Sequence, residues 1–262
     1  PAPIERWPDA VEAVIAGGCR VLRSAVVLRE TASTQDHARA AGVPVGTAVI
    51  AWRQTAGRGR LGRAWEDTQD AGVAVTFALP DAAPESLAMR SAVAAATAVR
   101  GFVPGDACGI KWPNDVVVDG RKIAGVLVER VDGRALVGIG INVAQRAFAP
   151  QLDAHATSLA RLGVTADRLD VLCALLRAVD DAFAAPEADI ERSYRALDRL
   201  TGRRCAFQTP AGRVEGTVRA VDPRLGLELE TASGPCFLPA ATTSVVPPQA
   251  GSRYGGGDAP SA

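Results

Sequence analysis

The 262-residue chain lacks an overall charge, because 29 Lys and Arg side chains balance 29 Asp and Glu side chains. This balance argues against the broad positive field that non-specific nucleic-acid binding requires, so any basic site must be local. Histidine is scarce as well, with only His37 and His155, which leaves little material for a zinc centre or a Ser-His-Asp triad. Charged residues break the longest apolar runs well short of the ~18 residues of a membrane span. The N-terminus, PAPIERWPDA, is unlike a signal peptide, so we expect a cytoplasmic protein that does not bind membranes.

The cysteines lack the spacing of a metal site or a disulfide framework. They are odd in number, scattered and without a CxxC pair: Cys19, Cys108, Cys173, Cys205 and Cys236. This pattern fits reduced thiols that pack as small hydrophobic side chains. No metal site built from protein ligands is therefore predicted.

Short β-rich runs dominate residues 24–143 of a sequence that is 48% apolar, enough for a buried core. The predicted strands are residues 26–28, 48–52, 73–79, 116–118, 123–128 and 135–143. Asp119-Gly120 and Asp132-Gly133 separate the last three, and Asp-Gly supplies the positive φ of tight hairpins. The sequence therefore predicts an α+β domain whose sheet is at least partly antiparallel, rather than a Rossmann fold.

Three helices are predicted around these strands. Ser33 or Thr34 can cap a short helix that runs through Ala41, and residues 85–102 form an alanine-rich helix. Thr165 can cap a longer helix, in which apolar residues from Leu169 to Phe183 recur at i, i+3, i+4 and i+7. One face of that helix should belong to the core.

After Gly202 the sequence pattern changes to short strands with alternating apolar residues, separated by turn residues. This pattern indicates a small β-barrel. We therefore place the α+β domain at residues 1–201 and the barrel at residues 202–248. Residues 249–262 are glycine-rich and are expected to be a disordered tail.

The stretch QTAGRGRLGRAW, residues 54–65, concentrates three arginines and three glycines. Glycine permits close backbone approach, and the guanidiniums of Arg58, Arg60 and Arg63 offer forked donors for phosphate or carboxylate. It is not a P-loop, because the G-x-x-x-x-G-K-[ST] spacing is absent. The alternatives are a mobile loop that wraps an anion, a solvated turn, or an RG-type nucleic-acid patch.

A second stretch, GIKWPNDVVVDGRKIAGVLVER, covers residues 109–130. Pro113 stiffens a turn at which Asn114 and Asp115 present an amide and a carboxylate. Lys122 opens an otherwise apolar strand, so its ammonium either snorkels to water or points at a buried anion. Asp115 by itself is a common turn former.

The third stretch, VGIGINVAQR, covers residues 137–146. Gly138 and Gly140 are two apart, so both lie on one face of a strand and leave space for a flat group against the backbone. Asn142, at the end of that strand, can hydrogen-bond such a group. The alternative is a bulged, closely packed strand.

Taken in order, TASTQDHA (31–38), QTAGRGRLGRAW (54–65), KWPNDVVVDGRKIAGVLVE (111–129) and GIGINV (138–143) resemble the motifs of the biotin protein ligases. The resemblance implies an α+β, class II synthetase-like catalytic domain at residues 1–201, built on a mixed, largely antiparallel sheet with packing helices. It further implies an SH3-like barrel after that domain. It also implies a two-step reaction. The carboxylate of biotin attacks the α-phosphate of MgATP to form biotinoyl-5'-AMP and pyrophosphate. A lysine of a biotin carboxyl carrier protein, from acetyl-CoA carboxylase or a related carboxylase, then takes the acyl group.

The resemblance assigns roles to individual residues. Biotin would be bound by Ser33, Thr34, Gln54, Gly57, Arg58, Gly59, Arg60, Lys122 and Gly125. The nucleotide would be bound by Arg58, Arg60, Trp65, Lys111, Asn114, Gly140 and Asn142. Lys122 and Arg60, with the Mg²⁺ that accompanies ATP, would hold carboxylate and triphosphate in line, and Asp115 would orient the carrier lysine. The arginine loop is expected to be loose when empty and ordered over the adenylate.

Two departures bear on function. The usual Ser-Thr-Asn of the family reads Ser33-Thr34-Gln35 here, which leaves open whether Gln35 repeats the contact of the asparagine. About 23 residues precede the first predicted strand, too few for the DNA-binding winged helix of regulatory members, so we expect a monofunctional ligase that is a monomer or weak homodimer.

Two other functions are weighed against this one. A lipoate or octanoate ligase of the same superfamily also joins an acid to a carrier lysine, although GRGRLGR together with KWPND favours biotin. A small nucleic-acid-binding module would use the arginine loop and the barrel, but neutral charge and 5% aromatic content count against it.

Overall fold

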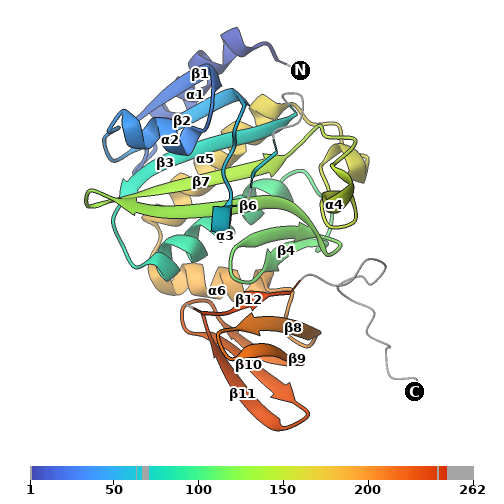
Figure 1. The fold of residues 1–262 in the computed structure, drawn as a ribbon. Coiled ribbons are helices and arrows are strands. Elements are labelled where there is room, and N and C mark those ends of the chain that lie inside the picture. The colour runs from blue at the N-terminus through green and yellow to red at the C-terminus, as the bar shows by residue number, and fades with distance from the viewer. Residues whose placement is uncertain (1, 63, 67–70, 241, 247–262) are drawn as a thin grey trace.

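The computed structural model describes residues 2–62, 64–66, 71–240 and 242–246, and Figure 1 shows a large mixed sheet with helices above a smaller β-unit. The large sheet has the order β1-β2-β3-β7-β6-β5-β4. β1 pairs with β2 in parallel, and every other pair in this sheet is antiparallel. The predicted α+β class is confirmed. The strands are β1 (Ser24–Thr31), β2 (Thr47–Gln54), β3 (Gly72–Pro80), β4 (Cys108–Lys111), β5 (Asp115–Val118), β6 (Arg121–Val131) and β7 (Arg134–Asn142).

Both predicted hairpin turns are present and have the backbone conformation that Asp-Gly favours. Asp119 and Gly120 have φ of 49° and 76°, and Asp132 and Gly133 have φ of 49° and 73°. Two consecutive residues with positive φ match the right-handed twist of the flanking strands. These turns set the register of β5, β6 and β7, which places the predicted site residues on one face of the sheet.

The alternation of side chains gives the sheet two different faces. Val75, Phe77, Val137 and Ile139 belong to the main core, which they share with residues of α3 (Pro84–Arg100) and α5 (Arg168–Ala184). The intervening residues face the opposite side, where α2 (Thr34–Ala40) covers β2, β3 and β7 around a small cluster of Ala38, Val43, Val49, Ala78 and Leu136. This second face carries few large side chains, so it has room for a ligand.

The helices agree with the sequence analysis in part. Ser33 caps α2, since its hydroxyl oxygen accepts hydrogen bonds from the backbone N–H groups of Gln35 and Asp36. The cap predicted at Thr165 is wrong. Asp167 caps α5, because its extended backbone lets the carboxylate accept from the Leu169 N–H at 2.8 Å, and the helix begins at Arg168. Three helices were not predicted: α1 (Trp7–Ala16), α4 (Pro150–Asp153) and α6 (Glu187–Leu197).

A second, antiparallel sheet follows α6 and is consistent with an SH3-like domain. It has the order β11-β10-β9-β8-β12 and buries Phe207, Val218, Leu227 and Leu229. Its strands are β8 (Arg204–Thr209), β9 (Gly212–Asp222), β10 (Gly226–Thr231), β11 (Gly234–Pro239) and β12 (Ser244–Val245). They fall within the predicted barrel at residues 202–248, whereas the predicted tail at 249–262 lies outside the described residues.

Arg224 connects this small domain to α6. Its guanidinium donates to Glu187 at 3.0 Å and pairs with Glu191 at 2.9 Å, and in Figure 1 the barrel strands lie beneath α6. Residues of both sheets also belong to one hydrophobic core. The small sheet is therefore packed against the larger α+β part of the chain.

All five cysteines are free, as the sequence analysis expected. Burial raises the pKa of the Cys108 thiol to about 11, so this buried side chain stays a protonated, unreactive part of the core. No helix in the described part of the chain is long and apolar enough to cross a membrane.

Candidate functional site

A row of very small residues crosses three strands on the α2-facing side of the sheet. Ala74, Gly140 and Gly125 are register partners on β3, β7 and β6. A Cβ added to Gly140 would collide with the Trp65 indole, and one added to Gly125 would lie 2.9 Å from the Lys122 side chain and 3.1 Å from Trp65. The flat space predicted at Gly138 and Gly140 is therefore found at Gly140, where the Trp65 ring lies over it, whereas the Gln35 side chain fills the place over Gly138.

A cavity of about 350 Å³ opens above this row. Its walls come from distant segments: the start of α2, the arginine loop, the turn between β4 and β5, residues 148–156 and the end of the barrel. All predicted site residues except Gly57 line it: Ser33, Thr34, Gln54, Arg58, Gly59, Arg60, Trp65, Lys111, Asn114, Asp115, Lys122, Gly125, Gly140 and Asn142. Gly57 is buried beneath, where a Cβ would collide with the Trp65 carbonyl. Arg63 lies outside the described residues.

One end of the cavity is uncharged and polar. The side-chain carbonyl of Gln54 accepts from the Thr34 N–H at 2.8 Å and from the Thr34 hydroxyl at 3.1 Å, while the Thr76 hydroxyl donates to Thr34 Oγ1 at 2.9 Å. Ser33, Thr34, Gln54 and Thr76 are all buried. A closed set of hydroxyl and amide groups around a small cavity suits a neutral ligand that both donates and accepts hydrogen bonds.

The other end is cationic. The Lys122 ammonium lies 2.6 Å from the Asp115 carboxylate and 5.9 Å from the centroid of the Trp65 ring. Arg60 donates to Asn114 Oδ1 at 2.6 Å and so ties the arginine loop to the turn between β4 and β5. Lys122 neither snorkels freely nor lies deeply buried, because it is paired with Asp115 and its side chain is 37% exposed.

The turn that carries Asn114 and Asp115 is supported from below. The Trp112–Pro113 peptide bond is cis, and the Pro113 carbonyl accepts a hydrogen bond from the Tyr194 hydroxyl of α6 at 2.9 Å. Burial, with added negative charge from Asp198 and Asp115, holds the pKa of Tyr194 well above its usual value, so this hydroxyl stays a neutral donor. Asn114 also donates to the Val126 carbonyl on β6 at 2.9 Å.

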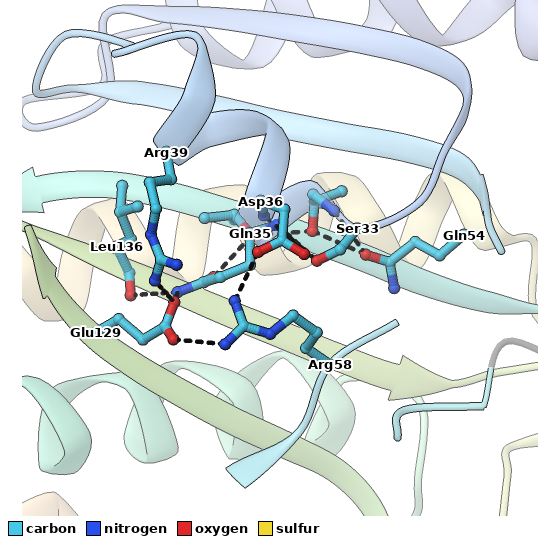
Figure 2. Close-up of polar contacts among 10 residues, drawn as sticks. Ser33, Gln35, Asp36, Arg39, Gln54, Arg58, Glu129 and Leu136 are labelled. Atoms are coloured by element: carbon cyan, nitrogen blue, oxygen red, sulfur yellow. Dashed lines mark hydrogen bonds and ion pairs between the residues drawn. The ribbon is translucent and has the colours of Figure 1, made fainter. Parts of the chain in front are cut away.

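Gln35, the departure from the family motif, lies under the polar end and does not extend into open space. It accepts from Thr76 at 3.0 Å and donates to the Leu136 carbonyl at 3.0 Å and to Glu129 at 2.9 Å (Figure 2). A Cβ added to Gly138 would lie only 2.8 Å from Gln35 Oε1. Gly138 therefore makes room for Gln35, as Gly140 does for Trp65.

Asn142 completes the cavity at the end of β7. Its amide donates to the Thr157 carbonyl at 3.0 Å, and its Oδ1 accepts from Gln145 at 3.4 Å. These bonds fix the side-chain orientation and link β7 to the segment that returns alongside Lys122, whose N–H donates to the His155 carbonyl at 2.8 Å.

Several lining residues were missed in the sequence analysis. Thr76 had a signal, because it is the polar residue on the second face of a strand whose first face is Val73, Val75, Phe77 and Leu79. No sequence pattern pointed to residues 148–156 or to Thr243, Ser244 and Val245 of the barrel, since only tertiary packing brings them to the cavity.

The structure and sequence both match known ligases. Residues 25–145 match the model of the Biotin/lipoate A/B protein ligase family. The chain is 38% identical to the biotin–[acetyl-CoA-carboxylase] ligase of Mycobacterium tuberculosis over 75% of this chain and 79% of the relative. It is 32% identical to the bifunctional ligase/repressor BirA of Bacillus subtilis, over 79% of this chain and 69% of that protein.

Among solved structures, the biotin protein ligase from Aquifex aeolicus in complex with biotin and ATP has a TM-score of 0.77 at 27% identity. The match covers 86% of this chain and 99% of the Aquifex chain. The glycine row, the polar end and the cationic end all lie within residues 25–145, the part that matches the family model. The chain is a member of the biotin protein ligases within the Biotin/lipoate A/B protein ligase family.

Proposed function

We infer that this chain joins biotin to a specific lysine of a biotin carboxyl carrier protein, at the expense of ATP and through biotinoyl-5'-AMP. The observation that carries this inference is one cavity with a neutral polar end, a bare glycine floor and a cationic end. The groups of biotin follow the same order: a ureido ring that donates and accepts hydrogen bonds, an apolar ring and chain, and a carboxylate.

The ureido ring binds at the polar end. Ser33, Thr34 and Gln54 supply hydroxyl and amide groups there, and Arg58 and Gly59 border the cavity from the loop side. Gly57 is buried next to them. Gly125 allows the apolar part of biotin to lie against β6. Thr34 and Gln54 are buried and hydrogen-bonded to each other, and the buried Ser33 hydroxyl accepts from backbone N–H groups of α2, so these three side chains are held in place before the ligand arrives.

The carboxylate of biotin then lies beside Lys122 and attacks the α-phosphate of ATP, and pyrophosphate leaves. Two anions must approach each other in this step, so fixed cations are needed to offset their repulsion. Lys122 and Arg60 supply that charge, and no protein nucleophile takes part. The adenosine side is bordered by Trp65, Gly140 and Asn142, with Lys111 and Asn114 near the phosphates.

Mg²⁺ enters with ATP in this scheme. Among the described residues no group of three or more His, Cys, Asp or Glu side chains could hold a metal ion, and Mg²⁺ is commonly held by one or two carboxylates together with substrate phosphates. Asp115 is the lining carboxylate nearest the cationic end. The ion would neutralise charge on the triphosphate.

In the second step Asp115 orients the carrier lysine, whose amine attacks the acyl carbon and releases AMP. The carrier belongs to acetyl-CoA carboxylase or a related carboxylase. We further propose a monomer or weak homodimer without operator-DNA binding, and a cytoplasmic location, which the need for ATP and the free thiols support.

The test is incubation with labelled biotin, ATP, Mg²⁺ and a carboxylase carrier domain, with the carrier-lysine variant as control. Label on the wild-type carrier alone is the expected result. Transfer of lipoate or octanoate in place of biotin would overturn the substrate assignment. Salt-dependent nucleic-acid binding without any response to biotin would overturn the enzyme assignment.

A further inference from the structure

The side chain of Arg58 is already bound on both of its terminal nitrogens. One donates to Asp36 Oδ1 on α2 at 2.6 Å, and the other donates to Glu129 Oε1 on β6 at 3.0 Å (Figure 2). The first arginine of the arginine loop therefore bridges two carboxylates from different elements of the catalytic domain. The hydrogen bond that Arg58 donates to Asp36 and the charge of Glu129 raise the pKa of Arg58, although that group is fully protonated in any case.

Glu129 is fixed by further partners. Its second oxygen accepts from Arg39 at 2.6 Å and from the Gln35 amide at 2.9 Å. Gln35 is buried, and its other hydrogen bonds reach the Leu136 carbonyl and Thr76 in the sheet. The carboxylate that holds Arg58 is thus oriented from the interior of the protein. An isolated ion pair at the surface contributes little to stability. An ion pair whose carboxylate is already held by other hydrogen bonds loses less side-chain entropy when it forms.

The backbone around Arg58 joins this anchor to the cavity. Arg58 forms an isolated antiparallel bridge with Ala64, and the Trp65 N–H donates to the Gly57 carbonyl at 2.9 Å. Two residues further on, Arg60 reaches Asn114 on the other side of the cavity. α2, which supplies Asp36, also supplies Thr34 to the polar end, so a fixed Arg58 holds the loop at a set distance from the biotin-binding groups.

We propose that the Arg58 side chain is a positioning residue, which uses Asp36 and Glu129 to anchor the arginine loop, and that it is not a phosphate ligand of the adenylate. The proposal rests on the adenylate-forming function argued above. Arg60 and Lys122 supply the charge that the phosphate meets, whereas the charge of Arg58 is offset by two carboxylates. Gln35, Asp36 and Glu129 become functional residues because they hold Arg58.

The experiment compares Asp36→Asn, Glu129→Gln, the double variant and Arg58→Met. It measures the dissociation rate of preformed biotinoyl-5'-AMP in a chase, the KM for biotin against kcat, and trypsin cleavage after Arg60. Loss of each pair should speed adenylate release by up to about fivefold, and the double variant should match Arg58→Met. Adding Arg58→Met to the double variant should change nothing more, since the three residues act as one unit. Cleavage after Arg60 should rise in parallel while kcat changes less than KM.

The matched control is Asp81→Asn. Asp81 binds Arg130 of the same strand β6 through two hydrogen bonds of 2.6 and 2.7 Å, so its loss removes a similar pair that does not touch the loop. Adenylate retention should be unchanged there. Arg58→Lys should recover part of the retention that Arg58→Met loses, because an ammonium can hold one of the two carboxylates.

A different result would overturn the proposal. If Arg58 is a phosphate ligand, Asp36→Asn and Glu129→Gln free its guanidinium and leave adenylate retention unchanged or improved, while Arg58→Met weakens it. Failure of the wild-type chain to form any adenylate would instead overturn the proposed function, so the two failures are distinct. All three side chains are at least 20% exposed, and circular dichroism checks that each variant is folded.

Discussion

The Lys122 ammonium and the Asp115 carboxylate lie 2.6 Å apart at the cationic end of the cavity. They come from β6 and β5, which are adjacent strands, and the hairpin at Asp119-Gly120 brings them together. The proposed mechanism assigns Lys122 to the first chemical step and Asp115 to the second. The pair therefore links the two steps, since binding of the biotin carboxylate beside Lys122 competes with Asp115 for the ammonium.

Lys122→Ala is expected to slow adenylate formation by at least about 100-fold, because one fixed charge at the reacting carboxylate and phosphate is removed. The side chain is 37% exposed and no part of the core, so the melting temperature should change little. Release of pyrophosphate in the presence of biotin and ATP is the measurement. A wild-type rate in a folded variant would contradict the assigned role.

Asp115→Asn is expected to slow transfer from preformed adenylate to the carrier lysine by about 10- to 100-fold, because the group that orients or deprotonates the amine is lost. Adenylate formation should fall less. Single-turnover transfer, started by mixing isolated enzyme-adenylate complex with carrier domain, separates the two steps. Full-rate transfer would exclude Asp115 from the second step.

Arg60→Gly is expected to release the adenylate about tenfold faster or more, since the charged contact with Asn114 and the charge facing the phosphate both disappear. Released adenylate acylates free amines, so labelling of bystander lysines should rise. The chase experiment measures dissociation, and biotin labelling of added albumin measures the leak. An unchanged dissociation rate would mean that Arg60 does not grip the intermediate.

Gly140→Ala is expected to raise the KM for ATP roughly tenfold, because a Cβ there collides with the Trp65 indole and displaces it from the glycine row. Gly101→Ala is the control, since Gly101 has an α-helical φ of −63° and its Cβ would meet only ordinary contacts. Steady-state kinetics with varied ATP distinguish the two. An unaltered KM in the Gly140 variant would show that this floor does not border the nucleotide.

Asp180→Asn is expected to lower the free energy of unfolding by about 1–3 kcal/mol at pH 7. Asp180 is 4% exposed and accepts from the N–H groups of Arg20, Val21 and Leu22 at 2.7–2.8 Å. Burial opposes its ionisation, but these three bonds outweigh burial and hold its pKa below the usual range. A lowered pKa gives stability that is fully present above the unfolded value of about 3.9 and is lost as pH falls through the folded value.

The measurement for Asp180 is urea unfolding of wild type and variant between pH 3 and 7. The difference between them should shrink on acidification. Asp181→Asn serves as the control, because the Asp181 side chain is 77% exposed in its pair with Arg20 and should cost little at any pH. A difference that is constant across this range would contradict the role of ionised Asp180.

By itself the sequence determined the class of fold, the hairpins and the motifs whose residues meet at the cavity. Turn chemistry and alternation are local properties, so Asp119-Gly120, Asp132-Gly133 and the runs between them were sufficient for the antiparallel part of the sheet. All but one of the site residues predicted from the four motifs line the cavity, although other lining residues were not predicted. Short helices are harder to predict, since α6 buries only Ile190, Tyr194 and Leu197. The cap of α5 was predicted at Thr165 but falls at Asp167, and both residue types favour that position.

Only the tertiary structure decided what each site residue contacts. Three contacts show this: Trp65 covers the glycine row, Tyr194 supports Pro113, and Arg58 is bound by Asp36 and Glu129. Each joins residues that are between 22 and 81 positions apart along the chain. Sequence patterns report which face of a strand a residue occupies, but hydrogen-bond partners are chosen by register, packing and charge. The same arginine-rich loop was therefore recognisable from its composition, while the different tasks of Arg58 and Arg60 became visible only in three dimensions.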